Sequence, residues 1–140
     1  MTLISIISIS SVSAQIYTDT YIKDANKVGL IWLSDINHNK YESAYNLLAE
    51  EGKTKYPKEA WIMLLNDLMV EFGSLESRSV TQRNFQSQME GLEDGFYVFI
   101  EYNSQYENTK EHTEYLLLKQ NDQAEWKILD YSYEFKNKEN

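Results

Sequence analysis

The sequence has no cysteine, and only one proline and five glycines occur among its 140 residues. Without cysteine the chain can form no disulfide, no thiolate metal site and no cysteine-linked lipid anchor. The scarcity of proline and glycine, with no repeat or low-complexity tract, leaves no candidate linker. The composition is therefore that of one globular domain, which a hydrophobic core alone must stabilise.

Positive charge is also scarce. Thirteen Lys and Arg residues stand against 22 Asp and Glu residues, which gives a formal net charge of −9. Such a chain would repel a phosphate backbone and an anionic membrane surface, so nucleic acid is not an expected partner. No apolar run reaches the roughly 18 residues that a membrane-spanning helix needs. We expect a soluble folded part with no membrane span.

The first 14 residues carry no charge and include an apolar run over residues 3–9. Small residues follow this run and end at Ala14, with Val12 two positions earlier, a pattern typical of a signal peptide that lacks the usual positive start. The alternative is a buried N-terminal strand or helix. Cleavage would leave residues 15–140 as a single domain, exported to the periplasm or the cell exterior.

The spacing of apolar residues predicts three helices. Steps of three and four predict the first over residues 19–36 and a short second one over residues 41–48. The third begins at Pro57, which a first helical turn tolerates, and ends at Gly73, which can adopt the left-handed closing conformation.

Beyond Gly73 the pattern changes to alternation and to β-branched or aromatic runs. These runs predict four strands, over residues 75–85, 96–106, 112–120 and 126–135. Their short connections suit antiparallel neighbours. The predicted fold class is α+β, with three N-terminal helices packed on a curled, four-stranded antiparallel meander.

The motifs for metal binding are incomplete. Asp35, Asn37 and Asn39 match positions one, three and five of a calcium-binding loop, whose oxygens surround a hard cation. Lys40 then stands where glycine is required, and Asn46 where a bidentate glutamate belongs. The simpler interpretation is a helix-capping turn, so no metal is expected there.

The two histidines, His38 and His112, are far apart in the sequence, and neither has a second histidine at metal-ligand spacing. The chain also has no Gly-x-Ser-x-Gly elbow, no P-loop and no dinucleotide-binding glycine pattern. We therefore expect neither a cofactor nor a catalytic triad.

Aromatic residues are concentrated in the predicted strands. A curled sheet covered by helices often keeps an apolar pocket with a few hydroxyl donors at its mouth. The candidate ligand-binding residues are Tyr97, Tyr102, Tyr115, Trp126 and Tyr131. The alternative is that these side chains simply fill a sheet and turn their hydroxyls to solvent.

A set of aromatic, glycine and charged positions runs in a defined order through residues 19–133. Its members are Trp32, Leu33, Asp35, Tyr41, Trp61, residues 73–78, Gly91, Leu92, Asp94, Gly95, Tyr97, Tyr102, Glu114, Trp126 and Tyr131. In this order they resemble the bacterial family called domain of unknown function 4019. The resemblance implies an exported bacterial protein with a cystatin-like or nuclear-transport-factor-2-like roll. Two positions depart from the family pattern, Glu90 in place of proline and Asp130 in place of glycine.

The charged strand residues of this set are Arg78 and Glu114. Glu114 shares a strand face with Leu116 and Leu118, where an unpaired carboxylate would be costly to desolvate. Arg78 is the expected partner because a guanidinium matches a carboxylate and stays charged in a partly dry setting. We therefore expect a structural ion pair between Arg78 and Glu114, and no catalytic residue is assigned.

The sequence supports two functional hypotheses. The first is a non-catalytic exported binding or interaction module with an unknown protein partner. Outside the two hypotheses stands the inhibition of other proteins through an exposed edge strand. The alternative is an enzyme or carrier for a small apolar ligand held in the cone of the roll, where a tyrosine hydroxyl and an acid could polarise a carbonyl.

Cleavage after Ala14 can be tested directly. We expect the intact mass of the protein recovered from an exporting host to correspond to a chain that starts at Gln15. A mature protein that still carries Met1 would contradict export through this leader.

Overall fold

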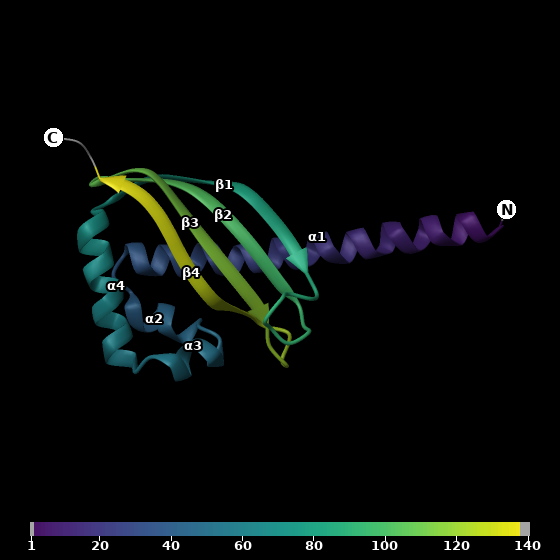
Figure 1. The fold of residues 1–140 in the computed structure, drawn as a ribbon, viewed down its shortest axis with the longest axis horizontal. Coiled ribbons are helices and arrows are strands. Elements are labelled where there is room, and N and C mark those ends of the chain that lie inside the picture. The colour runs from purple at the N-terminus through teal and green to yellow at the C-terminus, as the bar shows by residue number, and fades with distance from the viewer. Residues whose placement is uncertain (1, 138–140) are drawn as a thin grey trace.

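The structure, a computed structural model, describes the backbone of residues 2–137 and the side chains of residues 15–137. The described part contains four helices followed by four strands (Figure 1). The helices are α1 (Thr2–Asn37), α2 (Tyr41–Asn46), α3 (Glu50–Lys55) and α4 (Lys58–Phe72). The strands are β1 (Leu75–Gln86), β2 (Tyr97–Tyr106), β3 (Thr109–Gln120) and β4 (Trp126–Asn137). The predicted α+β class and the four strands are confirmed.

The strands form one antiparallel sheet in the order β1-β2-β3-β4, which is a simple meander that does not close. The helices lie on one face of this sheet, called the inner face below (Figure 1). Side chains alternate between the two faces of a strand. Buried apolar residues at alternate positions, such as Val98 and Ile100 on β2 and Leu116 and Leu118 on β3, therefore form the sheet side of the core.

Helix α1 supplies the other side of the core and approaches the sheet closely at Gly29. A Cβ atom at this position would lie 3.0 Å from the Tyr102 hydroxyl and 3.1 Å from a methyl carbon of Leu116. Further along α1, the Trp32 indole is buried and donates a hydrogen bond of 3.1 Å to the carbonyl of Ala44 on α2. These contacts fix α1 against the sheet and α2 against α1.

Helix α4 begins and ends where its sequence indicates. Pro57 is its N-cap residue, and Gly73 follows its last residue with a φ of 79°. The positive φ favours glycine at this turn, and a Cβ atom at Gly73 would also displace the side chains of Glu107 and Asn108, which lie within 3.0 Å of its position. The turn places α4 beside the end of the sheet (Figure 1).

Two helical features differ from the sequence-based expectation. Helix α1 begins at Thr2 rather than near residue 19, and its first part extends beyond the sheet (Figure 1). The proposed cleavage position after Ala14 thus lies within a helix, and the side chains before Gln15 are outside the described residues. The short helix α3 was not predicted. Within the described residues, no helix is both long enough and apolar enough to cross a membrane.

Candidate functional site

A buried carboxylate occupies the middle of the inner face. Glu114 has an exposed fraction of 0%, and both of its oxygens accept hydrogen bonds. Oε1 accepts from Arg78 Nη2 at 2.7 Å, from Arg78 Nε at 3.1 Å and from the Ser104 hydroxyl at 2.5 Å. Oε2 accepts from the hydroxyls of Tyr106 at 2.9 Å and Tyr131 at 2.6 Å. We call these five residues the Glu114 network.

The strand register explains how the network assembles. Ser104 on β2 pairs with Arg78 on β1. Tyr102, two residues before Ser104 on the same strand, pairs with Glu114 on β3. Ser104 and Tyr106 are two residues apart on β2, so both side chains point to the inner face. Every strand contributes at least one member, and the sheet must therefore be in register for the network to form.

Helix α1 also reaches the network. The Tyr106 hydroxyl accepts hydrogen bonds from Asn37 Nδ2 at 2.9 Å and from Arg78 Nη2 at 2.8 Å. Tyr106 can therefore donate its single proton to Glu114 while it accepts two hydrogen bonds. Asn37 was expected in a capping turn, and the structure shows that it ties the end of α1 to the sheet.

The Glu114 carboxyl is held in its charged form. Burial alone would raise its pKa, but the charge of Arg78 and the hydrogen bonds from Ser104, Tyr131 and Arg78 outweigh burial. The pKa of Glu114 is consequently lowered from its ordinary value of 4.5. Burial and the neighbouring Glu114 charge raise the pKa of Tyr131 well above its ordinary value, so its hydroxyl stays protonated. A carboxylate so occupied is a poor general base.

A buried histidine lies beside the network. His112 Nδ1 is 2.8 Å from the Thr109 hydroxyl, whereas Nε2 has no hydrogen-bond partner among the described residues. The imidazole ring contacts the rings of Phe72 and Phe135, with centroids 4.5 and 5.1 Å away. Burial lowers the pKa of His112; the Arg78 charge acts in the same direction and the Glu114 charge opposes it.

An apolar cavity of about 250 Å³ opens between the helices and strand β4. We call it the β4 cavity. It is lined by Trp32, Leu48, Gly52, Lys55, Tyr56, Trp61, Leu64, Leu65, Leu68, residues 128–131 and Tyr133. Tyr131 connects the cavity to the buried network, because its ring stands 5.1 Å from that of Trp32 while its hydroxyl donates to Glu114.

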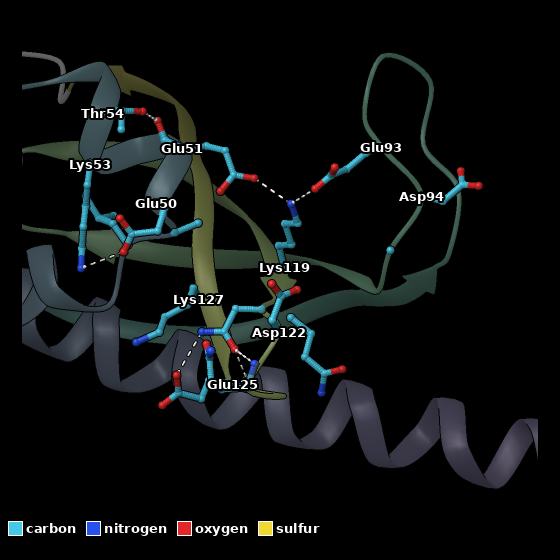
Figure 2. A pocket seen from close by; sticks show the side chains of 16 residues that line it. Glu50, Glu51, Lys53, Thr54, Glu93, Asp94, Lys119, Asp122, Glu125 and Lys127 are labelled. Atoms are coloured by element: carbon cyan, nitrogen blue, oxygen red, sulfur yellow. Dashed lines mark hydrogen bonds and ion pairs between the residues drawn. The ribbon is translucent and has the colours of Figure 1, made fainter.

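A second, larger hollow of about 760 Å³ is lined mostly by residues with charged or polar side chains (Figure 2). It lies between α3, the loop after β1 and the turn between β3 and β4. Lys119 reaches across it, with Nζ 2.7 Å from Glu51 and 2.6 Å from Glu93, and these hydrogen bonds raise the pKa of Lys119. Figure 2 shows both carboxylates pointing at this ammonium. Lys119 thereby ties α3 to the loop.

The structure does not gather the five aromatic residues expected at a ligand pocket. Tyr131 lines the β4 cavity, and the other four lie elsewhere. Two of them are held by hydrogen bonds, from the Tyr97 hydroxyl to the Glu93 carbonyl at 2.6 Å and from the Tyr102 hydroxyl to Asn26 at 3.1 Å. The other two contact aromatic rings, Tyr115 stacking on Phe99 and Trp126 meeting the edge of Tyr21.

Arg78 and Glu114, in contrast, are brought together. Their closest atoms are 2.7 Å apart, and the exposed fractions of the two side chains are 9% and 0%. No group of three or more potential metal ligands occurs among the described His, Cys, Asp and Glu residues. His38 Nδ1 lies 2.8 Å from the Ser34 carbonyl, far along the chain from His112.

Sequence reasoning missed the helix side of the β4 cavity. Trp61 and Leu68 belong to the apolar stripe of α4, and a stripe shows only that a face is covered. Leu64 lies on the same stripe, yet 46% of it is exposed in the structure, and the sequence gives no sign of this exposure. Only the placement of α4 relative to β4 leaves space between them.

The profile of the family described as Protein of unknown function (DUF4019) matches residues 29–131. The chain belongs to this family. No curated protein matches the chain. All five members of the Glu114 network lie inside the matched residues, as does the β4 cavity except for Tyr133. In this DUF4019 chain the matched region therefore contains both the buried network and nearly the whole cavity wall.

A double-mutant cycle tests the energetic coupling of Arg78 and Glu114. We expect Arg78→Met and Glu114→Gln each to cost about 3–5 kcal/mol, because each strands a buried polar partner. The double variant should cost clearly less than the sum, with a coupling above roughly 1 kcal/mol in urea unfolding.

The exposed pair Lys136 and Glu111, whose side chains are 73% and 70% exposed, provides the control for this cycle. We expect little coupling there, because solvent screens such pairs. Additive costs at Arg78 and Glu114 would refute the coupling.

The lowered pKa of His112 implies that stability depends on pH. Below its ordinary pKa of 6.5 the unfolded chain binds a proton more readily than the folded protein. The free energy of unfolding should therefore fall as the pH drops through this value. Replacing His112 with Phe should flatten this slope, measured by urea unfolding at a series of pH values.

The matched control for this measurement is the exposed His38. The His38→Gln variant retains His112 and its buried surroundings, and its slope between about pH 7.5 and 5.5 is measured beside that of His112→Phe. The Glu114 contribution is lost only at lower pH, because its pKa lies below 4.5. An unchanged slope in His112→Phe would refute the assignment.

Proposed function

We propose that this protein is an exported, non-catalytic binding module whose β4 cavity receives an apolar group. The observation that carries the proposal is the cavity itself, an open apolar space walled by aromatic side chains next to a carboxylate whose hydrogen bonds are already made. Apolar and aromatic walls with a few polar groups are the common composition of ligand sites.

The mouth of the cavity supports a binding role. Tyr56 and Leu64 are 41% and 46% exposed, although both line the cavity. An apolar group placed between them would remove this surface from water, at a gain of roughly 25 cal/mol for each Å². Deeper in the cavity, Trp61 and Tyr131 offer aromatic faces.

The chemistry of the cavity supports the absence of catalysis. Its lining includes no serine, cysteine or histidine. Its one carboxylate residue, Asp130, is exposed and pairs with Leu117 on the outer face, and its one basic residue, Lys55, is also exposed. The nearest buried acid, Glu114, is charged and accepts five hydrogen bonds. The Tyr131 hydroxyl directs its proton to Glu114, so it is not free to polarise a ligand carbonyl.

Export rests on the uncharged N-terminal segment that resembles a signal peptide. The same proposal places the mature domain in the periplasm or outside the cell. A fold without cysteine suits either place, since it depends on no disulfide.

Binding in the β4 cavity can be tested with 1-anilinonaphthalene-8-sulfonate, an anionic dye with an apolar aromatic body, excited directly. We expect saturable binding of one dye molecule, and about tenfold weaker binding to Leu64→Trp, whose larger side chain fills the mouth. The matched control is Met63→Trp, because Met63 is the preceding residue on α4, is 67% exposed and does not line the cavity.

The dye also binds partly unfolded chains. Near-ultraviolet circular dichroism must therefore show native packing in all three proteins. Equal affinity for the Leu64→Trp and Met63→Trp variants would contradict binding in the cavity.

A further inference from the structure

One wall of the β4 cavity is the edge of a strand. β4 is the last strand of the sheet, so one of its edges has no strand beside it in the described structure. Four consecutive β4 residues, 128–131, line the cavity. Tyr131 pairs with Leu116 of the inner face, whereas Asp130 pairs with Leu117 of the outer face, so the lining includes residues of both faces. This indicates that the backbone edge of β4 borders the cavity.

This edge already accepts one extended segment. The Ile128 N–H donates to the Leu47 carbonyl at 2.9 Å, and the Ala49 N–H donates to the Ile128 carbonyl at 2.8 Å. The result is a parallel bridge between Leu48 and Ile128. Beyond Ile128, β4 continues to Asn137, and no other bridge to this edge occurs among the described residues.

A β-bulge in β4 leaves further backbone groups unpaired at this point. Leu118 pairs with Ile128 and Leu117 pairs with Asp130, so Leu129 has no opposite residue on β3. A bulge leaves backbone groups of the extra residue outside the regular ladder. Leu129 borders the cavity directly.

The charges at the rim indicate which partner would fit. Lys55 stands 5.7 Å from the centre of the Tyr56 ring and forms no ion pair within the described residues. On the strand side, Asp130 pairs with Leu117, which belongs to the outer face of the sheet. An acidic side chain would thus be favoured near Lys55, and a basic one beside Asp130.

We propose that the β4 cavity is a docking site for an extended peptide segment of another protein. The segment pairs its backbone with the free edge of β4 beyond Ile128 and places an apolar side chain in the cavity. An acidic residue of the segment faces Lys55. This proposal rests on the proposed binding function and deepens it, because a peptide strand gains backbone hydrogen bonds in addition to apolar burial.

The test begins with a library of random nonapeptides displayed on phage. The library is selected on the full protein and depleted on the Leu64→Trp variant. We expect enriched peptides to share one apolar position with an acidic residue close to it. Synthetic copies should bind Met63→Trp like the unmodified protein, and should bind Leu64→Trp and Lys55→Glu at least about tenfold more weakly.

A backbone scan then tests strand pairing. In a paired strand, every second N–H points to the neighbouring strand, so methylating the peptide nitrogens one at a time should weaken binding at alternate positions only. Loss at steps of three and four would indicate a helix in the groove, and uniform tolerance would indicate capture of a side chain alone. Either pattern would overturn the proposal.

The failure of this proposal is distinguishable from failure of the binding function. If no peptide is enriched while the dye still binds in a manner blocked by Leu64→Trp, the cavity takes small apolar molecules and the strand-docking proposal is wrong. A second outcome is that the dye does not bind, while peptides are enriched and methylation weakens their binding at alternate positions. In that case strand docking is supported, and small-molecule binding is not.

Discussion

The fold depends on how one buried carboxylate is accommodated inside an apolar core. A buried carboxylate is strongly unfavourable unless donors replace the water that it has lost. Glu114, on β3, receives such donors from the three other strands, because Arg78 lies on β1, Ser104 and Tyr106 lie on β2, and Tyr131 lies on β4. A shift of one residue in any strand would turn a donor to the opposite face. The complete network therefore forms only when the four strands pair in the observed register.

The same network gives the proposed binding surface a rigid wall. Tyr131 is held at its hydroxyl by Glu114 and contacts Trp32 at its ring, so its face toward the β4 cavity has little freedom. Trp32 is in turn fixed by its hydrogen bond to the Ala44 carbonyl. A wall that is already ordered loses little conformational entropy when an apolar group binds to it. The buried charge therefore contributes to the proposed function, because it helps to order this wall before an apolar group binds.

Much of the fold could be predicted because its signals are local. Pro57 and Gly73 mark the ends of α4, and alternation after Gly73 marks the strands. Pairing of Arg78 with Glu114 could be expected from the cost of a carboxylate on an apolar strand face. The three hydroxyl donors around Glu114 could not be predicted, because serine and tyrosine are common on strands and only the strand register brings them together. Helix α3 was not predicted because it has no buried residue and therefore no apolar stripe. The β4 cavity was not predicted because it depends on distances between elements that are far apart in the sequence.

The most direct test of this account is the ionisation of Glu114, followed by the carbon-13 chemical shift of its side-chain carboxyl in an NMR titration. The signal is assigned by its disappearance in Glu114→Gln. The donors around the carboxylate predict that the shift remains at its ionised position as the pH falls through 4.5, the ordinary pKa of glutamate, and changes only below it. A carboxyl that takes up its proton above pH 4.5 would show that burial outweighs the network, and would contradict the account.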